Sequence, residues 1–323
     1  MEPSRNVLNW LLEPSQPAIR YHTLLRLLDR RPDDREVRDA SSLIPRIGWA
    51  RDLLALQKDE GVWESRRDLY QPKYTATIWR LIVLADLGMN AKDKRIRLPC
   101  EFFLKEYSRP DGGFDNSPVN GSRSEVCLTG NLTRTLFRCG YTDDTRVRAG
   151  YDWLVDHQMD DGGWHCFYER PLGKGTLDCW EALSAFSVLP QEKWSRRIKH
   201  SVERGAEFYL ERRLFRQGRR YAPWFRFHYP THYYYDILVG LDIITSLGYA
   251  DDKRLKPALR IMEKKRRADG TWAIDAIHPD LDEGADYKLM KRAKRFVLEP
   301  PNRHSKWITL TALTILKRIE EST

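Results

Sequence analysis

The sequence predicts an all-α protein in which an inner and an outer layer of helices form a closed ring around a central cavity. Three observations lead to this fold class: a motif that recurs along the chain, two helical patterns in each repeat, and few strand patterns. The closing position of the motif falls at residues 63, 114, 164, 220 and 272, and it is aromatic in all copies except the degenerate one at Arg220. A fixed period of this size is typical of a protein built from repeated helical or strand units.

The best copy of the motif runs from Arg148 to Trp164 and contains Gln158 followed by the pair Gly162-Gly163. Apolar residues at helical spacing precede the glutamine, which predicts one helix per repeat that ends at the motif. The glycines mark its end, because glycine adopts the left-handed conformation of a helix C-cap at little cost. A glutamine here can bond the backbone near the start of the next helix, with the aromatic ring beside it. We therefore expect Gln158 and Trp164 to fasten neighbouring repeats and not to bind a ligand.

A second helical pattern follows each motif after a loop, and it is richer in Leu, Ile, Ala and Thr and poorer in charge. This difference predicts that the apolar helices form the inner layer and the charged helices the outer layer. Residues 21–28 and 307–319 are expected to close the ring, and 221–229 is the one serious strand candidate. The chain, 1–323, is thus predicted to be one domain of about five helix pairs, with inner helices at 74–87, 125–139, 177–189, 233–247 and 307–319.

Composition limits the kinds of protein that this chain can be. Hydrophobic residues make up 41% of its 323 residues, which is enough for a large core, yet no apolar run is long enough to cross a membrane. The first residues lack the layout of a secretion signal, so we expect a cytoplasmic protein. The five cysteines form no CxxC pair and are expected to be free thiols, some of them available as ligands.

The net charge of +9 is concentrated in two segments, residues 212–226 and 253–267. Such clusters are typical of a solvated outer helix face. The alternative is a surface that attracts phosphate, diphosphate or an anionic membrane. Nucleic acid is not expected as a partner, since neither zinc-finger spacing nor an aromatic RNA-binding motif accompanies the charge.

The motif resembles the QW motif of the squalene and oxidosqualene cyclases, and the repeat is similar to that of the protein prenyltransferase β subunits. The start of the chain, Trp10-Leu11-Leu12 with residues 17–24, looks like that of short bacterial squalene-cyclase-like proteins of the prenyltransferase and squalene oxidase repeat type. The resemblance covers nearly the whole chain and implies the α/α toroid, a double ring of helices around a cavity. It also implies an isoprenoid-binding, cyclase-like or prenyltransferase-like enzyme whose ligand is a small apolar molecule, with or without a diphosphate.

The acid motifs of the terpene cyclases are missing from the sequence. The cyclisation branch protonates an alkene with an aspartic acid of a DxDD motif. A DDxxD cluster holds the magnesium that is used where a diphosphate is ionised. This chain has neither motif. The nearest string, Asp280-Leu281-Asp282-Glu283, lies in an insertion at 275–304 that is long enough to form a lid. The missing motif favours a non-catalytic binding or scaffold protein as the alternative, whereas the polar ends of the inner helices favour an enzyme.

The prenyltransferase branch binds zinc through an Asp and a Cys at the start of one inner helix and a His at the start of the next. Asp178, Cys179 and His232 occur in that order here, so the resemblance implies a zinc-dependent transferase as a second enzyme hypothesis. This sequence departs from the family in having Asp178 and Cys179 adjacent, which on a helix turns their side chains about 100° apart. Alternatively, Cys179 is a small core residue and His232 a packed histidine.

The remaining candidates lie at the amino ends of the predicted inner helices, where free N–H groups and the helix dipole favour anions. The aromatic run 225–235 can line a cavity for an isoprenoid or a carbocation, with Tyr235 or Tyr234 facing it, or can be plain core. An anionic head is expected near Arg123, Lys174 and Lys306, and a less favoured glycan-active toroid would use Glu125 and Glu181. The predicted catalytic residues are Asp178, Cys179, His232 and Tyr235, and the predicted ligand-binding residues are Tyr74, Arg123, Glu125, Lys174, Glu181, His228, Asp236, His304, Lys306 and Trp307.

Overall fold

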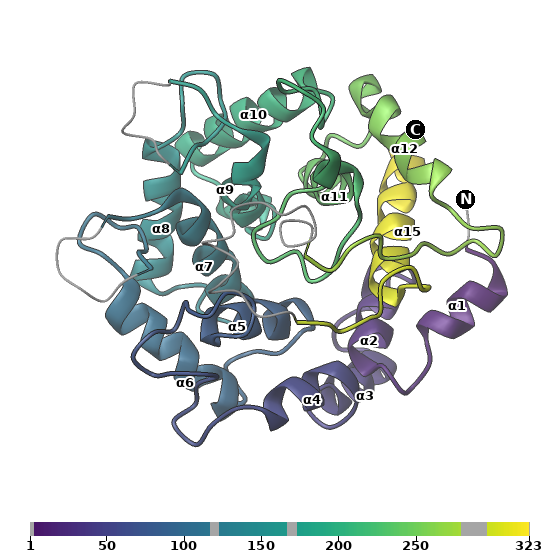
Figure 1. The fold of residues 1–323 in the computed structure, drawn as a ribbon, viewed down its shortest axis with the longest axis horizontal. Helices are drawn as coiled ribbons and strands as arrows, with labels where there is room; N and C mark the ends of the chain where they lie inside the picture. The colour runs from purple at the N-terminus through teal and green to yellow at the C-terminus, as the bar shows by residue number, and fades with distance from the viewer. Residues whose placement is uncertain (1–2, 117–122, 167–172, 279–295, 323) are drawn as a thin grey trace.

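Two concentric layers of helices form a ring in the computed structural model, which describes residues 3–116, 123–166, 173–278 and 296–322 (Figure 1). The arrangement is the predicted α/α toroid. The inner layer consists of α2 (Pro17–Arg26), α5 (Thr77–Asp86), α7 (Val126–Arg138), α9 (Trp180–Phe186), α11 (Ile237–Ser246) and α15 (Lys306–Glu321). The outer layer consists of α1 (Arg5–Leu11), α3 (Arg35–Leu43), α4 (Gly48–Ala55), α6 (Lys94–Phe102), α8 (Thr145–Asp156), α10 (Arg196–Glu211) and α12 (Lys256–Lys264).

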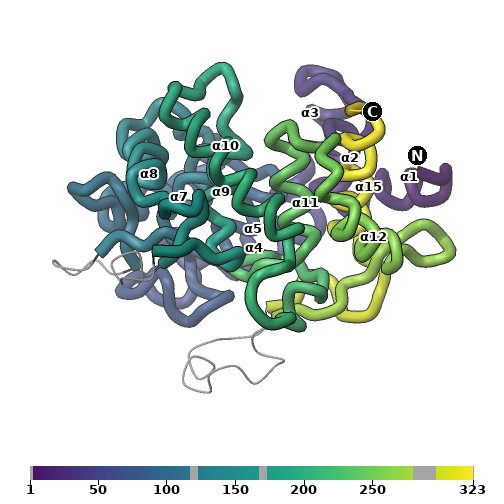
Figure 2. The backbone as a smooth tube through the Cα atoms, turned by 90° about the horizontal axis from the view of Figure 1, so that it is seen from above, coloured from purple at the N-terminus to yellow at the C-terminus, as the bar shows by residue number. Residues whose placement is uncertain are grey.

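The inner helices contact one another around the ring and close it. Helix α7 packs between α5 and α9, and α15 packs between α11 and α2, so the last inner helix meets the first. Between α2 and α5, the His22 ring donates a hydrogen bond from Nε2 to the Asp86 carbonyl over 2.8 Å. The two ends of the chain consequently lie near each other in both views of the backbone (Figures 1 and 2).

The connections between helices differ in length on the two faces of the ring. From α4 onward, each outer helix leads to the next inner helix through a long segment, such as 56–76 between α4 and α5. Each inner helix leads to the next outer helix through a short one, such as 87–93 between α5 and α6. The inner helices therefore begin on what we call the long-loop face and end on the short-turn face.

The glutamine and tryptophan of the motif fasten neighbouring repeats. Gln158 Nε2 donates hydrogen bonds to the carbonyls of Gly162 (2.7 Å) and Ser201 (2.8 Å), the latter in the first half of the next outer helix. Gln57 does the same for Arg95 at the start of α6 (2.7 Å). The hydrogen bonds predicted for the glutamines are thus confirmed. The Trp164 ring is fully buried, and its Nε1 donates to the Leu154 carbonyl (2.8 Å).

Two sequence-based expectations about local structure are wrong. The strand candidate 221–229 contains a short helical turn, η4 (Ala222–Phe225), and the described residues contain only isolated bridges and no strand. Helix α11 begins at Ile237 and not at residue 233, because the Asp236 side chain caps it by accepting a hydrogen bond from the Val239 N–H over 2.8 Å. The aromatic run therefore precedes the helix as a loop.

The described residues include only part of the 275–304 insertion. Most of the insertion that was expected to form a lid, together with Asp280 and Asp282, lies outside the described residues. Among the helices of the described ranges, none is both long enough and apolar enough to span a bilayer.

Candidate functional site

A cavity of about 380 Å³ occupies the centre of the ring, and all six inner helices contribute side chains to its wall. This volume is within the range of small-molecule sites. Its floor is made by His228, Tyr229 and Thr231, from the loop that precedes α11. Its wall carries the aromatic rings of Trp180 and Trp307. The charged side chains that line it, apart from the histidines, are Arg26, Asp86, Arg134, Arg138, Asp242 and Arg318.

The cavity opens on the short-turn face. The Arg138 and Asp242 side chains, near the carboxyl ends of their helices, are 36% and 34% exposed. The His228 side chain at the floor is 1% exposed. Water thus reaches the cavity from the carboxyl ends of the inner helices.

The other end of the ring is closed by stacked aromatic side chains from the long loops. The Tyr74 ring stacks on His278 (centroids 4.1 Å apart) and on His232 (4.8 Å). All three residues are buried. The loop that carries His232 is tied to the inner layer, since Asn131 of α7 donates a hydrogen bond to its carbonyl (3.4 Å). These contacts form an aromatic plug on the long-loop face of the ring.

The arginines at the mouth outnumber the aspartates. Asp242 pairs with Arg318 (2.7 Å) and Arg26 (3.2 Å), and Asp86 pairs with Arg138. Four arginines against two aspartates leave two positive charges in excess. Helix dipoles favour this distribution, because Arg26 and Arg138 are the last residues of α2 and α7, where the dipole presents partial negative charge.

Arg134 is the cation of this set that lacks an acidic partner among the described residues. Its guanidinium donates hydrogen bonds to Ser184 Oγ (2.8 Å) and Asn131 Oδ1 (3.2 Å) and lies 5.1 Å from the centre of the Trp180 ring. The residue is only 5% exposed. Burial lowers the pKa of Arg134, yet arginine keeps its charge in proteins. A buried, unpaired charge that lines a cavity is suited to receive an anion.

The floor of the cavity contains a histidine–aspartate pair. His228 Nδ1 lies 2.7 Å from Asp236 Oδ2, and the His228 backbone N–H donates to the same oxygen (3.1 Å). Because a carboxylate accepts hydrogen bonds, Nδ1 carries the proton when the ring is neutral, which leaves Nε2 as the basic nitrogen. His228 Nε2 and Tyr229 Oη are both buried and make no hydrogen bond within the described part of the chain.

The surroundings of the two cavity histidines shift their pKa values in opposite directions from the usual 6.5. Burial by itself lowers the pKa of His228, but the charge of Asp236 and its hydrogen bond outweigh burial and raise the pKa above 6.5. Burial and the charge of Arg26 lower the pKa of His22 to about 3, so that ring is neutral at physiological pH. His228 is thus the histidine of the pair that can exchange a proton near neutrality.

We expect the pKa of His228 to fall below 6.5 when Asp236 is replaced by asparagine. Asparagine still caps α11, so the change removes the charge and leaves burial as the main influence. Because the wild-type pKa is raised on folding, the pair stabilises the fold fully below pH 6.5, and this contribution is lost as the pH rises through the raised value. NMR titration of the imidazole nitrogens in wild type and Asp236→Asn measures both pKa values. His22, which stays neutral down to about pH 3, is the internal control. Equal His228 pKa values in the two proteins would contradict the conclusion that Asp236 raises the pKa of His228.

The structure brings three of the predicted residues together. His228 and Trp307 line the cavity, and Asp236 holds His228 from behind. Tyr74 and His232 lie in the aromatic plug. Neither Tyr235 nor Tyr234 lines the cavity, which contradicts the expectation that one of them faces it. Tyr235 points toward the outer layer, where its hydroxyl donates to the Leu214 carbonyl over 2.8 Å.

The basic residues predicted to hold an anionic head do not reach the cavity. Lys306 turns outward and pairs with Glu13 (2.8 Å), and Arg123 and Lys174 are exposed on the long-loop face. His304 lies 3.5 Å from Asp269 and half-exposed. The physical reason is the direction of the inner helices: their amino ends lie on the face that the loops close, and the entrance is at their carboxyl ends.

The predicted zinc ligands are not assembled into one site. Asp178 Oδ1 accepts a hydrogen bond from Trp224 Nε1 (2.7 Å), Cys179 contacts another cysteine, and His232 stacks on Tyr74. Within the described ranges, no group of three or more His, Cys, Asp and Glu side chains is arranged to hold a metal ion.

The carboxylates of the glycan hypothesis do not face each other across a cleft. Glu181 is fully buried, and neither it nor Glu125 lines the central cavity.

The residues that sequence reasoning missed are the charged ones of the mouth. A signal for them is present, since a charge inside an otherwise apolar helix requires an explanation. Asp242 interrupts the run Ile237–Ser246, and Arg134 and Arg138 are four residues apart and so share one face of α7.

The comparisons with known proteins find similar structures and no similar sequences. No protein-family model matches the sequence, and no curated protein matches it. Among solved structures, a protein from Actinoplanes is 18% identical, with 93% of this chain and 88% of that chain covered and a TM-score of 0.47. The type II terpene cyclase MstE from Scytonema is 15% identical in its apo form (96% and 88% covered, TM-score 0.44). The values are nearly the same for its R337A variant in complex with geranylgeranyl dihydroxybenzoate (15%, 96% and 87%, TM-score 0.44).

Proposed function

We propose that the central cavity binds a small anionic ligand with an apolar portion, of the isoprenoid class, and that His228 exchanges a proton with it. One observation carries the proposal: Arg134, a buried arginine without an acidic partner among the described residues, lines the same cavity as the imidazole of the His228–Asp236 pair. A site that combines an anion anchor with an acid–base group is the usual arrangement of a catalytic pocket.

Binding in this proposal depends on a division of the cavity between charge and aromatic surface. Arg134 and the excess charge of the mouth attract a carboxylate, phosphate or diphosphate. The apolar part of the ligand lies against Trp307 and Tyr229, whose rings stack with centroids 4.1 Å apart, and against Leu238 and Ile308. Aromatic faces also stabilise positive charge that develops on an apolar chain.

Chemistry in this proposal is proton transfer by His228. With the ring held by Asp236, Nε2 is the nitrogen that acts on the ligand in this proposal, as an acceptor when the ring is neutral and as a donor when it is protonated. The raised pKa keeps both forms accessible near neutral pH. The Tyr229 hydroxyl beside it can donate a hydrogen bond to a ligand oxygen. This assignment gives the chain an acid without the DxDD motif.

Calorimetry with three probes tests the binding part. Geranyl diphosphate is expected to bind more tightly than inorganic diphosphate, and geraniol more weakly than either. Equal affinities for geranyl diphosphate and diphosphate would mean that the apolar wall makes no contribution. No binding of any of the three would overturn the proposal and favour the scaffold alternative. The open, charged mouth argues against a scaffold, because a sealed apolar lumen would serve that role better.

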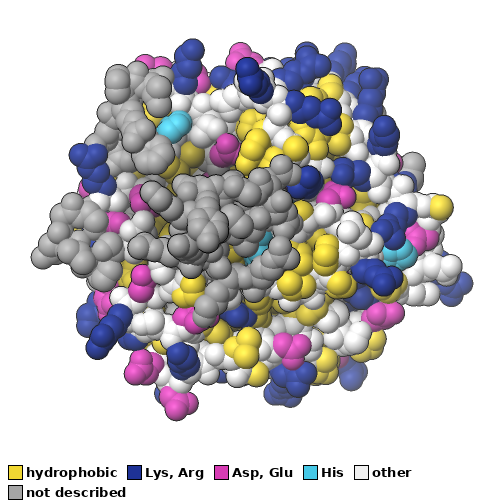
Figure 3. Space-filling view, in the orientation of Figure 1, with side chains coloured by type: hydrophobic (Ala, Val, Ile, Leu, Met, Phe, Trp, Pro, Cys, Tyr) yellow, Lys and Arg dark blue, Asp and Glu magenta, His cyan; other side chains and the backbone are white. Residues whose placement is uncertain are grey.

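The two basic segments of the sequence support a second, separate proposal, contact with an anionic membrane. Residues of both segments line one surface groove, in which every charged side chain is basic and the apolar ones are Phe215, Phe225 and Ile261. Figure 3 shows hydrophobic side chains bordered by Lys and Arg on this face of the molecule. Basic residues beside half-buried aromatics that line a surface groove are suited to an anionic lipid surface. The basic residues are Arg216, Arg220, Lys264 and Lys265.

Vesicle sedimentation tests the membrane proposal. The protein is expected to bind vesicles that contain phosphatidylglycerol and not vesicles of phosphatidylcholine alone. Reversing two charges, in Arg220→Glu with Lys264→Glu, is expected to weaken binding by at least about 30-fold, since the loss of each basic residue near such a surface costs about 1 kcal/mol and each added carboxylate is repelled as well. The matched control is Arg97→Glu with Lys105→Glu on the opposite part of the outer layer. Equal losses in both double variants would indicate attraction to net charge alone.

A further inference from the structure

Three of the five cysteines meet outside the central cavity. Cys127 lies in the first turn of α7, Cys179 at the end of η2 (Leu177–Cys179) just before α9, and Cys166 in the loop after α8. The Cys166 sulfur lies 2.9 Å from that of Cys127 and 3.5 Å from that of Cys179. Cys166 is therefore in contact with two thiols at once, an arrangement that the hydrophobic packing of single cysteines does not explain.

The backbone around the cluster is built to bring these sulfurs together. Gly163 and Gly175 cross so closely that a Cβ on Gly175 would lie 2.5 Å from the Gly163 Cα. The Thr176 N–H donates to the Trp164 carbonyl (2.9 Å) just beyond the crossing. The two segments thus run side by side, and the residues that follow, Cys166 and Cys179, meet.

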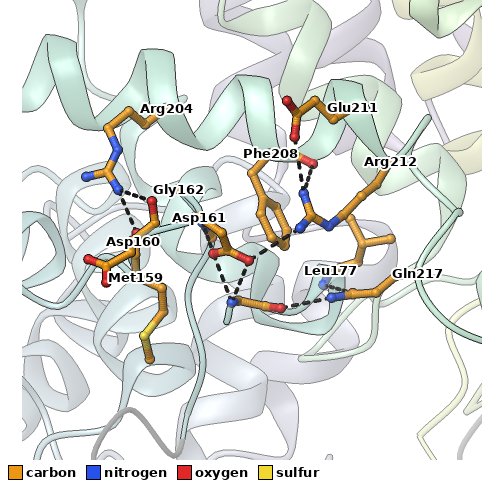
Figure 4. Close-up of polar contacts among 12 residues, drawn as sticks. Met159, Asp160, Asp161, Gly162, Leu177, Arg204, Phe208, Glu211, Arg212 and Gln217 are labelled. Carbon is orange, nitrogen blue, oxygen red and sulfur yellow. Dashed lines mark hydrogen bonds and ion pairs between the residues drawn. The ribbon is translucent and has the colours of Figure 1, made fainter. Parts of the chain in front are cut away.

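The outer helix α10 holds one of these segments in place (Figure 4). Gln217, shortly after α10, donates from Nε2 to the Gly175 carbonyl (2.8 Å) and accepts from the Leu177 N–H (2.8 Å). The Asp161 carboxylate accepts from the Gly175 N–H (3.0 Å) and pairs with Arg212 (3.3 Å). The position of Cys179 is therefore set by a hydrogen-bond network and not by loose packing.

Two carboxyl groups flank the cluster. Glu181, on the helix that Cys179 precedes, is 0% exposed, and neither of its oxygens has a hydrogen-bond partner in the described part of the chain. Glu125, two residues before Cys127, accepts a hydrogen bond from Asn116 (2.8 Å). Burial, with the nearby charge of Cys166 second, raises the pKa of Glu125 to about 7. The raised pKa values mean that these carboxyl groups can hold a proton near neutral pH and donate it to a group beside the sulfurs.

We propose that Cys127, Cys166 and Cys179 form a redox-active thiol site that reduces a hydroperoxide and stores the result as a disulfide, with Cys166 oxidised first and Cys127 as its resolving partner. Its geometry suits this role, because the central sulfur touches both candidate partners and both Cys127 and Cys166 are half-buried, not sealed. Hydrogen bonds with the two neighbouring thiols also hold the pKa of Cys166 well below its usual range.

The reaction balances in two steps. The Cys166 thiolate attacks one oxygen of the hydroperoxide; an S–O bond forms, the O–O bond breaks, and the leaving alkoxide or hydroxide takes a proton from the Glu125 carboxyl. The product is Cys166 sulfenic acid. The Cys127 sulfur then attacks the Cys166 sulfur; the S–S bond forms, the S–O bond breaks, and water leaves with the Cys127 proton. The hydroperoxide is reduced, and two thiols are oxidised to one disulfide.

The other two cysteines provide an internal control. Cys100 and Cys139 lie together in the core, and each is at most 1% exposed. The hydrogen bond with the Cys139 thiol, with burial second, raises the pKa of Cys100 well above its usual range. They are a thiol pair of the same protein that an oxidant reaches poorly.

The experiment treats the reduced full-length protein with hydrogen peroxide and maps the products by peptide mass spectrometry. The expected product links the Cys127 and Cys166 peptides, and Cys166 reacts at least about 10-fold faster than Cys100. In Cys127→Ser, dimedone is expected to trap sulfenic acid on Cys166; Cys100→Ser should behave as wild type. Equal rates at Cys166 and Cys100, or no linkage of Cys166 in wild type, would overturn the proposal. Stoichiometric zinc in the reduced protein that is lost in Cys166→Ser would also overturn it, in favour of a metal site.

Discussion

Replacing Arg134 by methionine is expected to weaken the binding of an anionic ligand in the central cavity by roughly 10- to 100-fold, because hydrogen bonds to charged groups contribute about 1.5–3 kcal/mol. Arg134 is the anchor because it is buried and its hydrogen bonds go to Ser184 and Asn131, not to an acid. Methionine keeps much of the length of the side chain, so the change removes charge and donors more than volume. Calorimetry with geranyl diphosphate and with geraniol measures the loss.

Two controls separate charge from folding in this experiment. Geraniol has no anionic head, so its affinity should not change in Arg134→Met. Arg148 lies on the outer layer, with its side chain 59% exposed, and Arg148→Met should bind geranyl diphosphate as wild type does. If Arg134→Met retained wild-type affinity while remaining folded by circular dichroism, Arg134 would not be the anchor.

Replacing Gly130 by alanine is expected to lower the free energy of unfolding by about 2 kcal/mol, at the upper end of what overpacking less helix propensity gives. A Cβ at this position would lie 2.5 Å and 2.6 Å from the carbonyl carbon and oxygen of Glu181 and 2.7 Å from the Ala182 nitrogen. These are backbone atoms of α9, so the two helices have to separate, and overpacking of this kind costs about 1–3 kcal/mol or more. The cost exceeds the gain of about 1 kcal/mol that alanine brings in a helix interior. Urea denaturation measures the difference.

Gly150→Ala in α8 is the matched comparison. It carries the same gain in helix propensity, but the added Cβ meets first the Thr133 hydroxyl, a side-chain atom that can rotate away. We expect Gly150→Ala to change stability by less than about 1 kcal/mol in either direction. Equal losses in the two variants would show that α7 and α9 are not in the close contact described here.

The sequence predicts the fold well because the fold depends on local patterns. The motif with Gln158 correctly marks the region where an outer helix ends, but the glycines do not cap it: α8 ends at Asp156, and Gly162, with its positive φ of +87°, forms a turn farther along the chain. The low charge of 126–138 and 237–246 correctly identifies α7 and α11 as inner helices. Each of these signals is read from a dozen neighbouring residues, and the repeat presents it several times.

The site was predicted only in part because it depends on which face of the ring is open. The sequence patterns locate the inner helices correctly, and the helix dipole favours their amino ends as the place of a binding site. His228, Asp236 and Trp307 were found there because they reach the cavity floor from that side. The mouth lies at the opposite ends of the same helices. Whether loops 56–76 or turns 87–93 cover the opening is decided by tertiary packing, which no local pattern encodes.

The contact of α15 with α2 has a consequence for biosynthesis. Cavity residues run from Tyr21 to Arg318, so a nascent chain that lacks the last inner helix has neither a closed wall nor the full set of mouth charges. Lys317 donates a hydrogen bond to the Leu27 carbonyl (3.2 Å) across 290 residues, and such distant contacts form late because a long loop must close first. The ring is therefore finished only after α15 has been synthesised, and until then its inner face is exposed to the cell's chaperones and proteases.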